Sequence, residues 1–201
     1  MLISYNGDMD ALRSLGWFLS IVYSTIPLYW IIVHPRARSW GSARKAPLTL
    51  LGGIWFGLWI AAGVMTWPWR DVVMYDTPWS WLVAAPFFAL GLYVYAKARR
   101  DFSLDQLVGR SELQPEKHEQ RLVTTGIRKR VRHPLYLGHL LELVAWTIGT
   151  GSIVCVGLLV FALTTGAMML EEEDAELESR FGDAYRDYRA RVPAIIPRLR
   201  D

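Results

Sequence analysis

The residues best suited to chemistry in this chain lie in two segments of its second half. The first, RKRVRHPLYLGHLLELVAW (128–146), begins with five basic side chains, His133 among them, and then becomes apolar. One acid, Glu142, stands about two turns into the apolar part. The second segment, LEEEDAELESRF (170–181), carries four consecutive acids directly after an apolar run. Basic residues thus precede one membrane-like helix, and acidic residues follow another. This arrangement indicates a polar site at a membrane surface.

The proline of the first segment predicts where a helix begins. Pro134 is tolerated in a first helical turn, because the N–H that it lacks would be unpaired there in any case. The helix start then offers backbone N–H groups beside Arg132 and His133, which suits a carboxylate or a phosphate. The alternative is that these cations only anchor the helix to anionic lipid headgroups.

A polar face continues down the same helix. Tyr136, His139, Trp146 and either Glu142 or Leu143 recur at spacings of three and four, so they share one face. An acid inside an apolar helix is costly and normally faces a partner or a wet cavity. Two interpretations stay open, a Glu142–His139 pair that locks helix packing and a Glu142 that lines a substrate cavity.

The acidic segment is expected to turn two of its carboxylates inward. An amphipathic stripe runs along the tail, which we expect to continue as a helix, and consists of Leu170, Leu177, Phe181, Ala184, Tyr185, Tyr188 and Val192. At about 100° per residue, Glu173 and Asp174 fall within about 60° of this stripe. Glu171 and Glu172 point away from it and are expected to be solvated. We interpret the inward pair as site acids rather than surface charges.

Apolar segments dominate the rest of the chain and predict an all-α integral membrane protein. Of 201 residues, 52% are hydrophobic. Five nearly uncharged segments approach the ~20 residues that a membrane-crossing helix needs, and they cover 15–33, 48–66, 79–96, 135–150 and 153–170. We expect five transmembrane helices, the last two forming a closely packed hairpin, with a cytoplasmic linker and a C-terminal amphipathic helix. Tryptophans flanking the apolar runs argue against a soluble bundle.

Charge predicts the orientation. Lys and Arg number four in 34–47, ten in 97–134 and six in 171–201, out of 22 in the chain. With five spans these segments share one face, so the N-terminus is expected outside and the C-terminus in the cytoplasm. The pI near 9.1 is explained by cations beside lipid headgroups and calls for no nucleic acid. The lone Cys155 gives no thiol cluster, and we expect no metal site.

These features together favour a small zwitterionic cofactor. A cationic helix start can hold a carboxylate, while an inward acid can hold an ammonium group or ribose hydroxyls. S-adenosyl-L-methionine has all these groups. We therefore divide the chain into a three-helix transmembrane scaffold (1–96) and a cofactor-binding catalytic region (97–201).

Two motifs carry a family resemblance. RLVTTGIRKRVRHPLYLG (121–138), followed by EDAELESRFGDAYRDYRARVPAIIP (173–197), resembles the isoprenylcysteine carboxyl methyltransferase and phospholipid methyltransferase group of integral-membrane enzymes. The resemblance covers roughly residues 97–201. It implies that S-adenosylmethionine binds to Gln120, Leu122, Val123, His133, Pro134, Leu135, Tyr136 and Glu173.

The sequence also departs from the family pattern. Gln120 stands where the family usually has a histidine, and Arg128 and Arg130 replace aromatic residues. Met169 occupies the place of an arginine that engages the substrate in the prenylcysteine enzymes. This argues against a carboxylate acceptor, and Glu142 favours an amine instead.

The leading hypothesis is methyl transfer from S-adenosylmethionine to a lipid or lipid-like acceptor taken from the bilayer, such as an isoprenoid or an amine-bearing lipid. Glu142 and Arg132 are the candidates for catalysis, by orienting the acceptor or removing its proton. We expect the protein in the cell membrane of a prokaryote. The alternatives are an NADPH-dependent membrane sterol or steroid reductase, which such C-terminal helices also resemble, and a non-catalytic lipid-binding membrane protein.

Overall fold

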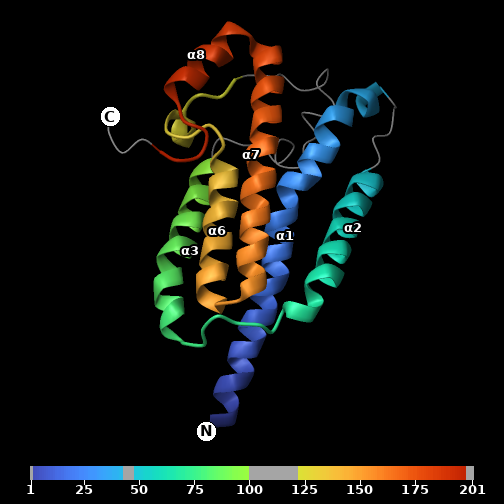
Figure 1. Ribbon diagram of the computed structural model, residues 1–201. Helices are drawn as coiled ribbons and strands as arrows, with labels where there is room; N and C mark the ends of the chain where they lie inside the picture. The colour runs from blue at the N-terminus through green and yellow to red at the C-terminus, as the bar shows by residue number, and fades with distance from the viewer. Residues whose placement is uncertain (1, 43–47, 100–121, 198–201) are drawn as a thin grey trace.

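The computed structural model describes residues 2–42, 48–99 and 122–197, and these form a bundle of long helices (Figure 1). Five helices cover the five apolar segments of the sequence. In chain order they are α1 (Leu2–Ser42), α2 (Leu48–Thr66), α3 (Trp79–Ala98), α6 (Pro134–Thr150) and α7 (Ile153–Phe181). Three shorter helices accompany them, the 3-10 turns η1 (Trp67–Trp69) and η2 (Gly126–Lys129) and the helix α8 (Asp183–Arg191).

The long helices pack in a definite order. α6 makes its largest interface with α3, and α1 makes its largest interface with α7. α1 and α7 also contact α6, while α2 packs on α1 at the outside of the bundle (Figure 1). The main partner of α6 is thus a helix distant in sequence, not its hairpin neighbour α7. Packing therefore crosses the expected boundary between residues 96 and 97, and the division into two domains stays a prediction.

Three helices of the described chain are long and apolar enough to cross a membrane. They are Met9–Ile32 within α1, Trp79–Ala98 and Ile153–Phe181. The all-helical membrane class is therefore supported. The other two expected spans form α2 and α6, and their crossing of the membrane remains a prediction. α6 has only 17 residues, which is at the lower limit for a span.

Specific residues set the helix ends near the site. Pro134 occupies the first turn of α6, as expected from its missing N–H. α6 ends at Gly151, whose φ of 63° is the left-handed conformation that glycine adopts readily. The loop before α3 is hydrogen-bonded to the turn between α6 and α7. Met74 N–H donates to Gly151 O at 2.8 Å, and Ile153 N–H donates to Val72 O at 3.1 Å.

The tail does not continue as one helix. α7 stops at Phe181, Gly182 follows with φ 57° and ψ −132°, and α8 begins at Asp183. The expected C-terminal amphipathic helix is present as α8. Its expected continuity with α7 is wrong, since Gly182 takes a backbone conformation that breaks the helix. α8 folds back over the start of α6 instead of extending α7 (Figure 1).

Three glycines of α2 do not serve close packing in the described structure. A Cβ built on Gly52, Gly53 or Gly57 would meet nothing within 4 Å. Exposed apolar side chains, including Phe56, Ile60 and Val64, line the same helix. Helix surfaces that face lipid expose apolar side chains in this way.

Candidate functional site

Most of the charged residues singled out in the sequence gather at one end of the bundle, while Glu142 and His139 lie further along α6. The start of α6, the acidic end of α7 and helix α8 meet there, beside the 3-10 turn η2 (Figure 1). α7 has 29 residues, a length of about 43 Å, against about 30 Å of hydrocarbon in a bilayer. Its acidic last turns therefore extend past the apolar region, where charged groups can gather.

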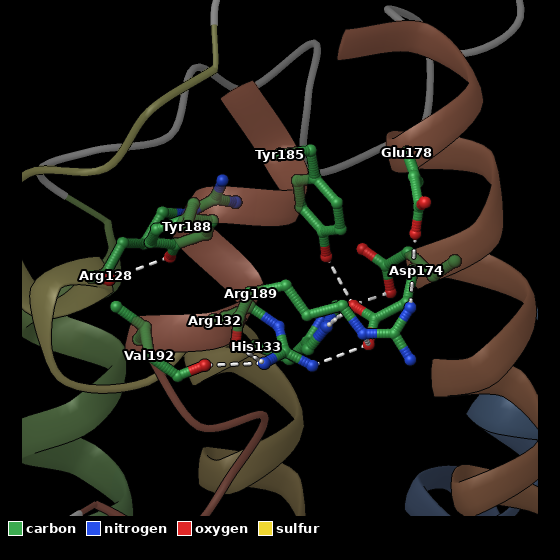
Figure 2. Close-up of polar contacts among 10 residues, drawn as sticks. Arg128, Arg132, His133, Asp174, Glu178, Tyr185, Tyr188, Arg189 and Val192 are labelled. Atoms are coloured by element: carbon green, nitrogen blue, oxygen red, sulfur yellow. Dashed lines mark hydrogen bonds and ion pairs between the residues drawn. The ribbon is translucent and has the colours of Figure 1, made fainter. Parts of the chain in front are cut away.

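Asp174 is the centre of this site and is only 4% exposed. Its Oδ2 lies 2.6 Å from Arg132 Nη2, and its Oδ1 lies 3.0 Å from His133 Nε2 (Figure 2). The Tyr185 hydroxyl donates a further hydrogen bond to Oδ1, and Arg189 Nε lies 3.5 Å from Oδ2. One buried carboxylate thus joins the start of α6 to α8, and charge-assisted bonds of this kind are strong.

Two aromatic side chains of α8 cover the site. Tyr185 and Tyr188 share one helix face and are buried together with Val192, with Leu122, Leu177 and Phe181 packed around them. Burial, and the hydrogen bond to the Asp174 carboxylate, raise the pKa of Tyr185. The Tyr188 hydroxyl donates to the carbonyl oxygen of Arg128 at 2.7 Å. Five of the seven residues of the expected stripe therefore form one cluster that holds α8 on the end of α7, namely Leu177, Phe181, Tyr185, Tyr188 and Val192. Ala184, also expected in the stripe, is exposed.

Arg132 fastens the segment after α8 to the start of α6. Its Nη1 donates to the carbonyl oxygen of Val192 at 2.5 Å. Its backbone N–H donates to Pro193 O at 2.9 Å, and the N–H of His133 donates to Ala194 O at 3.0 Å. Together with the Asp174 ion pair, these contacts give Arg132 a positioning part in the architecture of the site.

His133 lies between two carboxylates. Its Nε2 faces Asp174, and its Nδ1 lies 3.3 Å from Oε2 of Glu173. Burial alone would lower the pKa of His133, but Glu173 and Asp174 outweigh it and raise this pKa to about 9. The imidazole is therefore protonated at neutral pH, with both ring nitrogens acting as donors.

The four consecutive acids divide as the stripe predicted. Asp174 is buried and Glu173 is half-buried, while Glu171 and Glu172 are exposed. The sequence predicted both Glu173 and Asp174 to be inward site acids, and the family resemblance assigned a cofactor contact only to Glu173. In the structure Asp174 makes the buried contacts, and Glu173 pairs with His133 at the edge. Asp174 lies within about 60° of the stripe, and this position was the signal in the sequence for its burial.

The other expected cofactor residues lie around the same helix start where the structure describes them. Pro134 is buried, and Leu135 and Tyr136 are half-buried. Leu122 and Val123, also half-buried, precede η2, with Leu122 packed beneath α8. Gln120 falls outside the described residues. The structure thus brings the described members of the set together at one end of the bundle.

The polar face of α6 points inward among the helices. Glu142, Leu143 and Trp146 are all buried. The ring of Trp146 meets Trp81 and Phe88 of α3, with centroids 5.9 and 5.0 Å apart. The shared face predicted from spacing therefore packs against α3.

His139 stands within a group of tyrosines from three helices. Its ring centroid lies 5.5 Å from Tyr23 of α1, 5.6 Å from Tyr95 of α3 and 6.0 Å from Tyr136 of α6. Among the described residues no ion pair joins His139 to Glu142, and His139 Nδ1 and Glu142 Oε1 have no hydrogen-bond partner. The interpretation of the two residues as a packing pair is therefore wrong.

Sequence reasoning missed Tyr23 and Tyr95, which come from helices interpreted as plain scaffold. Both are tyrosines in apolar helices, where a phenol needs a partner when buried. Arg189 of α8 was missed too, because only folding brings it to Asp174.

Comparison with known proteins identifies the chain's relatives. It is 42% identical over 83 residues to methanethiol S-methyltransferase 2 of Bradyrhizobium diazoefficiens, covering 40% of this chain and 30% of that protein. It is 33% identical over 119 residues to protein-S-isoprenylcysteine O-methyltransferase of Schizosaccharomyces pombe, covering 57% of this chain and 48% of that enzyme. The chain is therefore similar to methyltransferases whose names refer to methanethiol and to isoprenylcysteine.

The match to these relatives is partial. The chain spans less than half the length of the two methyltransferases. A protein of Haemophilus influenzae is 41% identical over 59 residues, which cover 29% of this chain and 94% of that protein. No protein-family profile matches the chain, and no solved structure matches it. The family resemblance seen in the two motifs is confirmed by the named methyltransferases.

Proposed function

We propose that this protein transfers a methyl group from S-adenosyl-L-methionine to a lipid or lipid-like acceptor drawn from the bilayer. The observation that carries the proposal is His133, protonated at the start of α6 between the carboxylates of Glu173 and Asp174. This arrangement places cationic and anionic groups side by side at the end of apolar helices. The named relatives act on a small thiol and on a prenylated cysteine.

The groups at the start of α6 fit the donor's chemistry. The first turn of a helix presents unpaired N–H groups and a positive dipole end, which favour a carboxylate. The protonated His133 adds a positive charge beside Pro134. Glu173, half-buried at the edge, supplies an acceptor for an ammonium group or ribose hydroxyls. Leu122, Val123, Leu135 and Tyr136 offer apolar surface for a purine ring.

Arg132 takes a supporting part in this proposal. Its guanidinium is bonded to Asp174 and to the carbonyl oxygen of Val192. It therefore positions His133 and the segment after α8, in place of the acceptor contact expected from the sequence. Glu142 remains the candidate for contact with the acceptor.

The sulfonium donor supplies an activated methyl group, so the protein's task is chiefly alignment. Holding donor and acceptor in line can contribute roughly 7–11 kcal/mol to the lowering of the barrier. In this proposal the buried Asp174 network keeps the donor end fixed, and the acceptor enters from the apolar side of the bundle.

We propose that all five long helices cross the membrane. The ends of α3 and α7, the start of α6 and α8 then lie on one side, and the N-terminal end of α1 lies on the other (Figure 1). Since the basic segments 97–134 and 171–201 share the site's side, the positive-inside rule favours the cytoplasm for the site. The cofactor would then enter from the cytoplasm.

Calorimetric titration of the purified full chain in detergent with S-adenosylhomocysteine, the product, tests the proposal. Binding is expected, and Glu173→Ala is expected to weaken it roughly 10- to 100-fold, as for loss of a hydrogen bond to a charged group. Glu172→Ala, an exposed neighbour, is the matched control and should bind as the wild type does. Unchanged affinity in Glu173→Ala contradicts the assigned role.

Thermal-shift measurements separate this function from the alternatives. S-adenosylmethionine should raise the melting temperature, because a ligand that binds only the native state stabilises it. NADPH should leave it unchanged. A rise with NADPH alone would instead favour a reductase, and no rise with either would favour a non-catalytic protein.

A further inference from the structure

Three buried polar atoms lie on α3 and α6, the two helices that share the largest interface among the described residues. They are the hydroxyl of Tyr95, Nδ1 of His139 and Oε1 of Glu142, and in the described chain none of them has a hydrogen-bond partner. We refer to these three residues as the α3–α6 polar cluster. The rings of Tyr95 and His139 lie 5.6 Å apart.

Two glycines hold the members of the cluster close together. A Cβ at Gly91 of α3 would lie 2.7 Å from Glu142 Oε1, and a Cβ at Gly138 of α6 would overlap the ring of Tyr95. Gly91 precedes Tyr95 by one helical turn, and Gly138 precedes Glu142 by one turn. Each helix thus places a large polar side chain against a glycine of the other, which lets the two backbones approach closely.

The cluster is unexplained by the architecture alone. Buried polar groups in native proteins are nearly always hydrogen-bonded, and each exception calls for an explanation. An ionisable residue within a membrane segment indicates a functional site by default. The three atoms are also complementary to a ligand, because the Tyr95 hydroxyl can donate while His139 Nδ1 and Glu142 Oε1 can accept.

A line of ring contacts joins the cluster to the site at the start of α6. The rings of His133 and Tyr136 lie 6.2 Å apart, and those of Tyr136 and His139 lie 6.0 Å apart. His139 follows His133 by six residues, a rise of about 9 Å along the helix. Contacting rings along α6 therefore link the cluster to the donor end of the site.

We propose that the α3–α6 polar cluster receives the reactive end of the acceptor and that His139 Nδ1 takes its proton. The inference rests on the proposed methyl transfer and names the acceptor's chemical class, a neutral nucleophile that carries an N–H or S–H proton. No ion pair joins Glu142 to a lysine or arginine among the described residues, so the cluster offers no cationic partner to a carboxylate acceptor.

The step balances in atoms and electrons. The lone pair of the acceptor's nitrogen or sulfur forms a bond to the methyl carbon. The bond from that carbon to the sulfonium sulfur breaks, and its electron pair stays on sulfur to give a neutral thioether. The acceptor's proton passes to His139, and Glu142 stabilises the imidazolium that results. A carboxylate acceptor has no proton to lose and would not need His139.

The test uses the full chain in lipid nanodiscs with S-adenosylmethionine and three probes. They are a long-chain alkyl amine, a long-chain alkyl thiol and N-acetyl-S-farnesylcysteine, whose ionisable acceptor is a carboxylate, with methylated product measured by mass spectrometry. We expect the amine or the thiol to be methylated in preference to the carboxylate. Preference for the carboxylate, or no methylation of amine and thiol by protein that binds S-adenosylhomocysteine, overturns the inference.

Substitutions at His139 and Glu142 test which side chains assist proton removal from the acceptor. His139→Phe keeps an aromatic ring among the tyrosines but removes Nδ1, so we expect turnover of the preferred probe to fall at least 100-fold. Glu142→Gln should also reduce turnover, by roughly tenfold or more. Thr147→Val, which removes a buried hydroxyl from α6 away from the cluster, is the matched control and should retain turnover within about threefold.

Binding of S-adenosylhomocysteine shows whether each variant is folded. It should stay within about twofold of the wild type in His139→Phe and Glu142→Gln. If His139→Phe does not bind, His139→Gln serves as the second variant. Turnover within about threefold of the wild type in a variant that binds S-adenosylhomocysteine refutes the role of His139. Failure of the wild type to bind refutes the proposed function instead.

Discussion

Arg132 Nη2 and Asp174 Oδ2 lie 2.6 Å apart, and their side chains are only 8% and 6% exposed. The pair joins residues 42 positions apart in the chain, one before α6 and one near the end of α7. Tyr185 and His133 bond the same carboxylate. The integrity of this end of the protein therefore depends on one buried negative charge.

Asp174→Asn is expected to destabilise the protein strongly. It keeps the shape of the side chain but leaves Arg132 and His133 buried without their charge partner. Breaking one side of a buried ion pair typically costs about 3–5 kcal/mol. Thermal unfolding of the detergent-solubilised chain measures the loss. Glu171→Gln, at an exposed position, should change stability little, and an Asp174→Asn protein as stable as this control would contradict the central place of Asp174.

Stability should fall in alkaline solution because of His133. Its folded pKa of about 9 exceeds the ordinary value of 6.5, so its charged form stabilises the fold. This contribution, on the order of 3 kcal/mol, is fully present below pH 6.5 and is lost as pH rises through about 9. Melting temperatures from pH 6 to pH 10 should decline more in the wild type than in His133→Asn. Parallel curves for the two proteins would rule out this linkage.

Gly182→Ala should weaken the attachment of α8. Gly182 has φ 57° and ψ −132°, a conformation that costs a residue with a Cβ of order 1–3 kcal/mol. A Cβ there would meet no neighbour within 4 Å, so the effect comes from the backbone alone. Limited proteolysis should cut the variant faster between α7 and α8. Gly157→Ala, likewise open but inside α7, is the control and should be no less resistant than the wild type.

Gly138→Ala should disturb the α3–α6 interface. The added Cβ would lie 2.8 Å from Cδ1 of Tyr95, and overpacking of this kind typically costs about 1–3 kcal/mol. We expect a lower melting temperature than for Gly57→Ala, whose Cβ would meet nothing within 4 Å on α2. Equal melting temperatures would mean that the two helices are not held as closely as described.

Local sequence determined the elements and their ends. Apolar runs of nearly membrane length predicted where the long helices lie, and Pro134 marked the start of α6. The spacing of Tyr136, His139 and Trp146 predicted one face, and the stripe in the tail predicted that Glu173 and Asp174 turn inward. These features depend on residues close together in the chain, so the periodicity of a helix suffices to find them.

Only the tertiary structure decided which charges meet. Asp174 rather than Glu173 is the buried acid because Arg132, His133 and α8 surround it from other parts of the chain. Gly182 breaks the tail into two helices, which allows Tyr185 to reach that carboxylate. Tyr95 and Gly91 matter because α3 lies against α6. Contacts between distant segments follow from how the helices pack, and the periodicity of one helix carries no information about its partner.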